Sequence, residues 1–138
     1  MTRVFWDTNL FIYLLEGGRL APRVRQLRER MLARGDQLVT STLTLGEVLV
    51  KPQQAGDSVA LDHRDAIQQV ATIVPFDMAA ALHYATIRAD RSVKPPDAIQ
   101  LACAGAIGVD LFITNDDRLS RKSAPGVRFI ASLEHAFL

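Results

Sequence analysis

The chain has 138 residues, a length that suits one compact domain over residues 1–138 and leaves no room for a second independent core. With 49% apolar and 22% charged residues and no low-complexity tract, its composition is that of a globular protein rather than a disordered one. The net charge is only +1, but this small value conceals a local excess of arginine in the first quarter of the chain.

The cysteine content and the apolar stretches indicate the cellular compartment in which the protein is expected. The single cysteine, Cys103, cannot form an internal disulfide, and the N-terminus lacks the basic region, apolar core and small-residue cleavage site of a secretory signal. The longest nearly apolar stretch, 98–109, is interrupted by Gln100 and is shorter than the roughly 20 residues that cross a bilayer. We therefore expect a cytoplasmic protein without a membrane-inserted segment.

The first half of the chain alternates strand and helix patterns. A β-prone run ends just before Asp7, and helical segments follow it, separated by a break at Gly17–Gly18 and stopped at Gly35. After a second β-prone run, cap residues from Ser41 to Thr44 introduce a helix that contains Glu47. These patterns predict strands at 3–6 and 37–40, helices at 8–16 and 20–34, and a helix through Leu49 that ends by Lys51–Pro52.

The second half continues the alternation. A helix cap at Asp77 precedes a stripe of apolar residues at helical spacing, namely Met78, Leu82, Ala85 and Ala89. Two prolines pre-set the first turn of the next helix, which begins close to Asp97 and is apolar on nearly every face, so it should be buried. The pattern predicts helices at 58–70, 78–89 and 95–109, strands at 71–75, 111–114 and 127–130, and a terminal helix from Ser132.

Strands that alternate with helices favour an α/β fold with a mostly parallel sheet, in which ligands bind beyond the carboxyl ends of the strands. Asp7 and Asp116 each follow a predicted strand, whereas Glu47 and Asp97 lie near the starts of helices that follow strands. The predicted topology therefore brings these four acidic residues to one edge of the sheet.

Each acid also has an ordinary structural explanation. Asp7 would cap the helix that starts at Thr8, and Asp97 would complement a helix dipole. Glu47 would complete a capping box with Thr44, and Asp116 or its neighbour Asp117 would form an Asx turn. These explanations do not account for an acid at every position that the topology aims at one crevice, so a joint site is favoured.

Two carboxylates about 4 Å apart repel each other by roughly 4 kcal/mol at an effective dielectric constant near 20, so a cation must compensate for converging acids. An all-oxygen set of ligands suits Mg²⁺ or Mn²⁺, and Mg²⁺ is commonly bound by few carboxylates together with waters and substrate phosphates. One or two such ions would support attack of water on a phosphodiester. The number of ions stays open.

Basic side chains in two groups could hold a polyanion. We nominate five for contacts with the phosphates of such a polyanion: Arg23, Arg28, Arg118, Arg121 and Lys122. For the arginine-rich stretch before Gly35, the alternative is that its side chains simply form the solvent-exposed face of an amphipathic helix.

Four sequence blocks resemble the signature of the PIN-domain ribonucleases, and most closely that of the VapC-type toxins of toxin–antitoxin pairs. The blocks are Asp7-Thr8-Asn9, Thr44-Leu45-Gly46-Glu47-Val48, Pro96-Asp97-Ala98-Ile99-Gln100-Leu101-Ala102 and Ile113-Thr114-Asn115-Asp116. The resemblance covers nearly the whole chain. It implies a three-layer α/β/α domain with a five-stranded sheet, an endoribonuclease activity that needs Mg²⁺ or Mn²⁺, a cognate antitoxin and a homodimer.

The resemblance also implies residue roles. Asp7, Glu47, Asp97 and Asp116 would form the catalytic, metal-binding quartet, with Asp7 and Asp97 as direct ligands. Thr8, Asn9 and Thr114 would support them. Adjacent acids leave open whether Asp116 or Asp117 points inward, although Asp116 matches the family position better.

Two other functions remain open. A phosphoaspartyl enzyme or receiver would use Asp7 as its phosphorylated residue, but Asn9 and the Phe5-Trp6 pair depart from the expected acidic patterns. A catalytically silent RNA-binding module would keep the fold and the basic groups without cleaving RNA. The complete acidic quartet favours the nuclease.

Overall fold

The computed structural model describes residues 2–136, which form a five-stranded sheet with the strand order β3-β2-β1-β4-β5. Every neighbouring pair of strands is parallel, so the predicted α/β class and five-stranded sheet are confirmed. The strands are β1 (Arg3–Trp6), β2 (Gln37–Ser41), β3 (Thr72–Val74), β4 (Val109–Thr114) and β5 (Val127–Ser132). The helices are α1 (Thr8–Glu16), α2 (Ala21–Arg34), α3 (Thr42–Gln54), α4 (Asp57–Val70), α5 (Met78–Ile87) and α6 (Pro95–Ile107).

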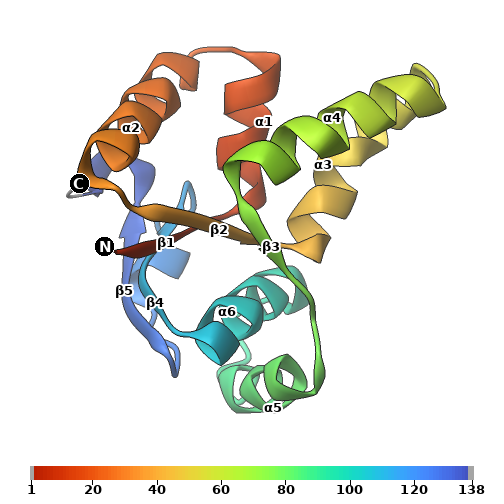
Figure 1. Cartoon of the computed structure of the whole chain (residues 1–138). Coiled ribbons are helices and arrows are strands. Elements are labelled where there is room, and N and C mark those ends of the chain that lie inside the picture. Colours follow the sequence, from red (N-terminus) through yellow and green to blue (C-terminus); the bar gives the residue numbers. More distant parts are fainter. Residues whose placement is uncertain (1, 137–138) are drawn as a thin grey trace.

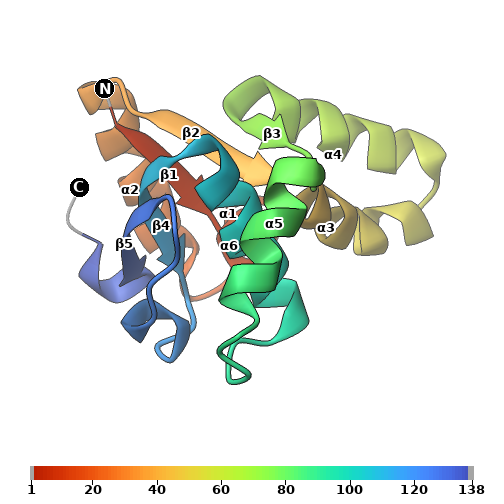
Figure 2. The same ribbon diagram turned by 90° about the horizontal axis from the view of Figure 1, so that it is seen from below.

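The sheet is the middle of three layers (Figure 1). Helices α1, α2, α3 and α4 lie on one side of it, and α5 and α6 lie on the other, as both views show (Figures 1 and 2). Two clusters of buried apolar residues fill the spaces between these layers. The three-layer α/β/α arrangement predicted from the sequence is therefore present.

The alternation of side chains along β1 explains how the central strand serves both layers. Val4 and Trp6 belong to the cluster beneath α1 and α2, whereas Phe5 belongs to the cluster beneath α6, and all three are fully buried. Phe5 stacks on Phe112 of the neighbouring strand β4, with ring centroids 4.9 Å apart. This packing fixes the register of the two strands whose carboxyl ends carry Asp7 and Asp116.

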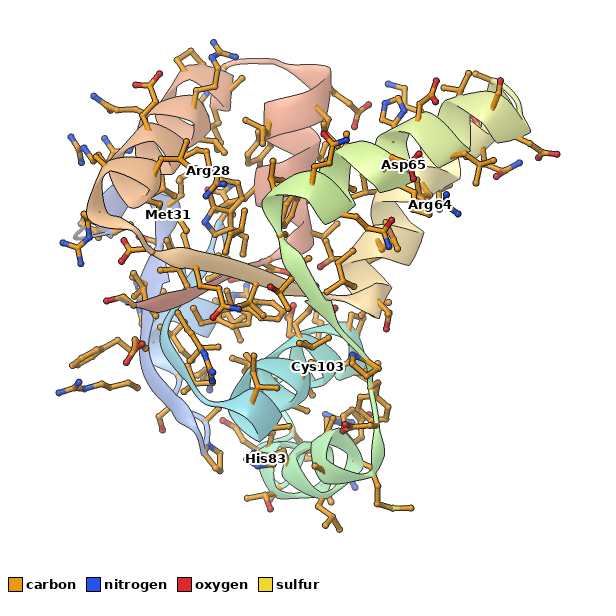
Figure 3. The ribbon with its side chains drawn as sticks, in the orientation of Figure 1. Arg28, Met31, Arg64, Asp65, His83 and Cys103 are labelled. Atoms are coloured by element: carbon orange, nitrogen blue, oxygen red, sulfur yellow. The ribbon has the colours of Figure 1, made fainter. Side chains whose placement is uncertain are left out.

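Helix α6 is buried, as predicted, and a glycine allows its close approach to the chain before β5. A Cβ added to Gly105 would lie 2.2 Å from the carbonyl oxygen of Pro125 and 2.9 Å from Nδ1 of His83. Figure 3 shows His83 between α5 and α6. The absence of a side chain at position 105 therefore lets three segments meet.

Several predicted boundaries differ from the observed ones, among them the end of the helix predicted at 95–109, which stops at Ile107 before β4 begins at Val109. Helix α3 does not end by Lys51–Pro52 but includes Pro52 and continues to Gln54. The predicted terminal helix is wrong, since β5 extends to Ser132 and, among the residues that the structure describes, a short 3₁₀ helix, η2 (Leu133–His135), follows it. The helix predicted at 78–89 ends at Ile87.

The capping box considered as an alternative explanation for Glu47 is not formed. Ser41, rather than Thr44, caps α3 by accepting a hydrogen bond from the backbone N–H of Thr44. Glu47 therefore lies in the second turn of the helix, too far along to complete a box. Its carboxylate is bound elsewhere, by Thr8.

The apolar stripe of α5 faces outward instead of toward the core. Met78 and Leu82 are 79% and 69% exposed, and Ala85 and Ala89 are exposed as well. The helix packs through its opposite side, on which Ala80 and Ile87 are buried. The described part of the chain thus carries an uncovered apolar surface on this helix.

None of the helices in residues 2–136 has the length and apolar character needed to span a membrane.

Candidate metal centre

The topology places all four predicted acids around the carboxyl ends of the central strands. Asp7 directly follows β1, and Asp116 follows the adjacent strand β4. Glu47 lies in α3, which starts where β2 ends, and Asp97 is the third residue of α6. A backbone hydrogen bond of 3.0 Å from the N–H of Asp7 to the carbonyl oxygen of Ile113 ties the start of α1 to β4.

Asp7 accepts hydrogen bonds on both carboxylate oxygens. Oδ1 accepts from the backbone N–H of Thr8 at 2.8 Å and from Nε2 of Gln100 at 3.3 Å, and Oδ2 accepts from the hydroxyl of Thr114 at 3.0 Å. The helix-cap explanation for Asp7 is therefore correct, but incomplete. The same carboxylate is also held from two neighbouring elements, which fixes its orientation.

A buried polar network lies behind Asp7 and Glu47. The hydroxyl of Thr8 donates to Oε1 of Glu47 at 2.8 Å and lies 3.2 Å from the hydroxyl of Thr44. Gln100 donates to the hydroxyls of both threonines, and its own carbonyl accepts from Ser41. The sequence prediction included Thr8 as a supporting residue but gave no role to Gln100, whose only signal was a polar side chain in an otherwise apolar helix.

Two adjacent hollows open at this edge. The larger has a volume of about 410 Å³ and is lined by Asp7, Thr8, Asn9, Ile12, Glu47, Val50, Pro96, Asp97 and Gln100. The smaller, of about 60 Å³, is lined by Ser92, Val93, Lys94, Asp97, Asp116, Arg118, Leu119 and Lys122. Asp97 lines both hollows. Three of the acids thus share the larger hollow, and Asp116 reaches the group from the smaller one.

Asp116, rather than Asp117, lines the smaller hollow. Its Oδ1 accepts from the backbone N–H groups of Arg118 and Leu119 at 2.9 and 3.3 Å, so the Asx-type turn considered from the sequence is present. Its backbone N–H donates to the hydroxyl of Thr114, the residue that also binds Asp7. Asp116 and Asp117 are both exposed, but Asp117 does not line the smaller hollow.

The charges of these acids affect one another. The pKa of Asp97 is raised to about 6, by burial first and then by the nearby charges of Asp7, Asp116 and Glu47, while Lys94 opposes the shift. Burial also raises the pKa of Asp7, with a contribution from Glu47, although hydrogen bonds from Thr8, Thr114 and Gln100 counteract it. The geometry therefore concentrates negative charge that lacks full compensation.

This set of ligands fits a hard divalent cation. Within residues 2–136, the ion pairs observed involve none of the four acids, so no lysine or arginine neutralises them by direct contact. Across that same range, no three acidic, histidine or cysteine side chains are grouped tightly enough to enclose a metal by themselves. An open site of one or two carboxylates completed by water and substrate oxygens is the coordination that Mg²⁺ characteristically adopts.

The other nominated residues fall in different places. Asn9 is exposed and lines the larger hollow, and Arg118 and Lys122 line the smaller one, with Arg121 exposed just beyond them. Lys94, which also lines the smaller hollow, was not nominated from the sequence because it stands alone next to two prolines.

Arg23 and Arg28 lie on α2, which is separated from α3 by α1 in both views (Figures 1 and 2). Arg23 donates a hydrogen bond of 2.5 Å to the backbone carbonyl of Glu134, and partial burial lowers the pKa of Arg28. The structure therefore does not bring these two arginines to the larger hollow, which the acids line.

The fold and the site define a class: a three-layer α/β protein with an acidic centre at the carboxyl edge of a parallel sheet. The family model of the PIN domain matches residues 4–125. The chain belongs to the PIN domain family, as the sequence resemblance predicted.

Comparison with solved structures finds similar folds. The chain is similar to one in VapBC2 from Rickettsia felis, whose structure includes a DNA fragment from the promoter, with 14% identity, a TM-score of 0.73, and coverage of 94% of this chain and 98% of that one. A chain of DNA-bound VapBC from Salmonella typhimurium gives 20% identity, a TM-score of 0.71 and coverage of 96% and 99%. A chain of a toxin–antitoxin complex from Klebsiella pneumoniae gives 25% identity, a TM-score of 0.69 and coverage of 90% and 94%. Comparison with curated protein sequences finds no match.

Proposed function

We propose that this protein is an endoribonuclease that hydrolyses RNA phosphodiester bonds with the help of Mg²⁺ or Mn²⁺. PIN domains are nucleases. The observation that carries the proposal for this chain is the larger hollow, called the acidic hollow below, in which Asp7, Glu47 and Asp97 lie together. Basic side chains line the smaller hollow beside it. Negative charge for a metal and positive charge for a phosphate are thus adjacent.

In this proposal Asp7 and Asp97 bind the cation directly, and Glu47 and Asp116 complete the acidic quartet. A divalent cation in such a site lowers the pKa of a bound water and stabilises charge on the phosphoryl oxygens. Thr8 orients Glu47, and Thr114 orients Asp7, through the hydrogen bonds described above. Asn9 lies at the opening, where its amide could contact the RNA.

Basic residues would hold the RNA backbone. Lys94, Arg118 and Lys122 line the smaller hollow and would contact a phosphate next to the one that reacts. Lys122 is already paired with Asp90 at 3.0 Å, so Lys94 and Arg118 have the larger expected effect. Arg121, Arg23 and Arg28 would contact RNA farther from the acidic hollow.

We further propose that the protein acts in the cytoplasm as the toxin of a toxin–antitoxin pair. The support is its similarity to chains of VapBC and other toxin–antitoxin complexes over nearly their whole length. Expression of the chain alone should therefore arrest growth, and co-expression of an antitoxin encoded beside it should restore growth. Normal growth with an active chain would favour a housekeeping nuclease instead.

A homodimer is part of the same proposal. The exposed apolar stripe on α5, formed by Met78, Leu82, Ala85 and Ala89, is a surface that a second copy would cover. Symmetric dimers are the commonest oligomers of soluble proteins, and an uncharged face suits such an interface.

The proposed activity is tested by incubating purified protein with RNA and either Mg²⁺ or Mn²⁺. Cleavage should stop with EDTA and fall at least a hundredfold in Asp7→Asn, whereas Asp62→Asn, an exposed change on α4, should keep the wild-type rate. RNA binding without any metal-dependent cleavage would point to the silent binding module. A phosphoryl group found on Asp7 would point to the phosphoaspartyl class.

A further inference from the structure

Gln100 lies behind the acidic site and forms several hydrogen bonds there. Its side chain is 2% exposed, and it is surrounded by residues from the chain that follows β1 and from the start of α3. We propose that Gln100, together with Thr44, is a positioning residue that orients the carboxylates of Asp7 and Glu47 for metal binding. This inference rests on the proposed metal-dependent function.

The amide reaches several groups at once. Nε2 of Gln100 lies 2.6 Å from the hydroxyl of Thr44, 3.1 Å from the hydroxyl of Thr8 and 3.3 Å from Oδ1 of Asp7. Oε1 accepts a hydrogen bond from the hydroxyl of Ser41. A single side chain of α6 therefore connects the starts of α1 and α3.

The chemistry of the partners fixes the direction of these hydrogen bonds. An ionised carboxylate only accepts, so the hydroxyl hydrogen of Thr8 is given to Glu47 and the Nε2 group of Gln100 must face Asp7. The oxygen of Thr8 is then free to accept from Gln100 and from Thr44. Reversing the amide would place its carbonyl against the carboxylate of Asp7. The hydroxyl hydrogen bonds consequently run from Thr44 through Thr8 to Glu47, and the amide N–H of Gln100 faces Asp7.

The charge of the donor also matters. An amide supports the buried carboxylate of Asp7 without adding a positive charge, whereas a lysine or arginine at this position would neutralise the acid and repel a metal cation. The network holds Oε1 of Glu47 and Oδ1 of Asp7 from behind. The lone pairs that remain on these carboxylates are available toward the hollow that the two acids line.

A purely structural role for Gln100 predicts a different result. If the amide served only to join α6 to β2, its loss would lower the melting temperature and leave the metal affinity of the folded protein unchanged. Residues that orient metal ligands, by contrast, change metal affinity or activity about 10- to 100-fold when they are altered. Metal affinity therefore separates the two roles.

The experiment titrates Mn²⁺ alone into EDTA-treated, dialysed protein by calorimetry, and circular dichroism checks that each variant is folded. Gln100→Met keeps the size of the side chain and removes the amide, and Leu101→Met introduces the same residue at the next position, in the core beneath α6. Thr44→Val removes the hydroxyl, and Thr44→Ser retains it. We expect 10- to 100-fold weaker Mn²⁺ binding for Gln100→Met and Thr44→Val, and wild-type binding for Leu101→Met and Thr44→Ser.

Wild-type Mn²⁺ affinity in folded Gln100→Met would overturn the inference while leaving the proposed nuclease intact. If Gln100→Met does not fold, the two Thr44 variants test the inference instead. Equal Mn²⁺ affinities for Thr44→Val and Thr44→Ser would overturn it. A wild-type protein that binds no Mn²⁺ or Mg²⁺ would instead contradict the proposed function itself, and this inference with it.

Discussion

Asp7 at the end of β1 and Asp97 in the first turn of α6 repel each other across the acidic hollow. The charge of Asp7 adds to the effect of burial, and the pKa of Asp97 rises from 3.8 to about 6. A pair of acids that is costly without a cation, and accessible through an open hollow, is the feature on which the proposed metal chemistry depends.

The metal-free protein should become more stable as the pH falls from 7.5 to 5. Because the folded pKa of Asp97 lies above its unfolded value, the native state binds more protons in this interval, and the free energy of unfolding rises as Asp97 is protonated. At pH 7.5, Asp97→Asn should stabilise the EDTA-treated protein by about 1 kcal/mol, a value already reduced for the partial exposure of this residue.

Thermal melts of both proteins at pH 5 and 7.5 measure this effect. The stabilisation corresponds to roughly 3 °C at pH 7.5 and should shrink at pH 5. Asp62→Asn on the outer face of α4 serves as the control. A melting temperature of Asp97→Asn at or below that of the wild type at pH 7.5 would argue against close approach of the acids.

The basic side chains of the smaller hollow should bind phosphate. In an Asp7→Asn background, which prevents cleavage, Lys94→Ala and Arg118→Ala should each weaken binding of a short RNA and lower the slope of log affinity against log salt by about 0.7. Arg64→Ala is the matched control, since Arg64 pairs with Asp65 on α4 (Figure 3). Fluorescence anisotropy at several salt concentrations gives both quantities, and equal slopes for all variants would exclude this role.

The close contact between α6 and the segment before β5 should make Gly105 intolerant of a side chain. Gly105→Ala brings a Cβ within 2.2 Å of a backbone oxygen, so we expect a loss of about 1–3 kcal/mol in the free energy of unfolding. Gly46→Ala is the control, because an added Cβ there meets no atom within 4 Å and α3 should gain up to about 1 kcal/mol. Urea denaturation compares the two, and equal effects would show that the packing argument is wrong.

The outward stripe of α5 should govern association. Leu82→Glu places a charge in the centre of the stripe, where Leu82 is 69% exposed, so the fold should survive and the dimer should dissociate. Leu61→Glu on α4, where Leu61 is 47% exposed, is the control for an added surface charge. Light scattering coupled to gel filtration measures the mass. A Leu82→Glu variant with the mass of a dimer would place the interface elsewhere.

The order of strands and helices could be predicted because turn residues and apolar periodicity mark them locally. The positions of Asp7 and Asp116 followed directly, since Asp7 comes immediately after β1 and Asp116 two residues after β4, and the carboxyl ends of both strands must lie at the ligand-binding edge. The contacts of Glu47 could not be predicted from its local sequence. Its partner Thr8 belongs to another helix, and the local sequence suggested a capping box instead.

Other features depend on tertiary contacts that no local pattern encodes. The stripe from Met78 to Ala89 was identified, but not its direction, because the opposite face of α5 uses Ala80 and Ile87 for packing. Helix α3 continues through Pro52, where the contacts of the helix with α4 outweigh the local preference to stop. The role of Gln100 was not predicted because its hydrogen-bond partners, Thr8, Thr44 and Asp7, lie on other segments of the chain. A single amide in an apolar helix does not reveal these partners.

The most direct test of the account locates a Mn²⁺ ion by anomalous diffraction from crystals grown with Mn²⁺. We expect an anomalous peak in the larger hollow, about 2.1 Å from a carboxylate oxygen of Asp7 or Asp97, and the loss of this peak in Asp7→Asn. Metal-saturated crystals without a peak between these acids, or with one that persists in Asp7→Asn, would contradict it.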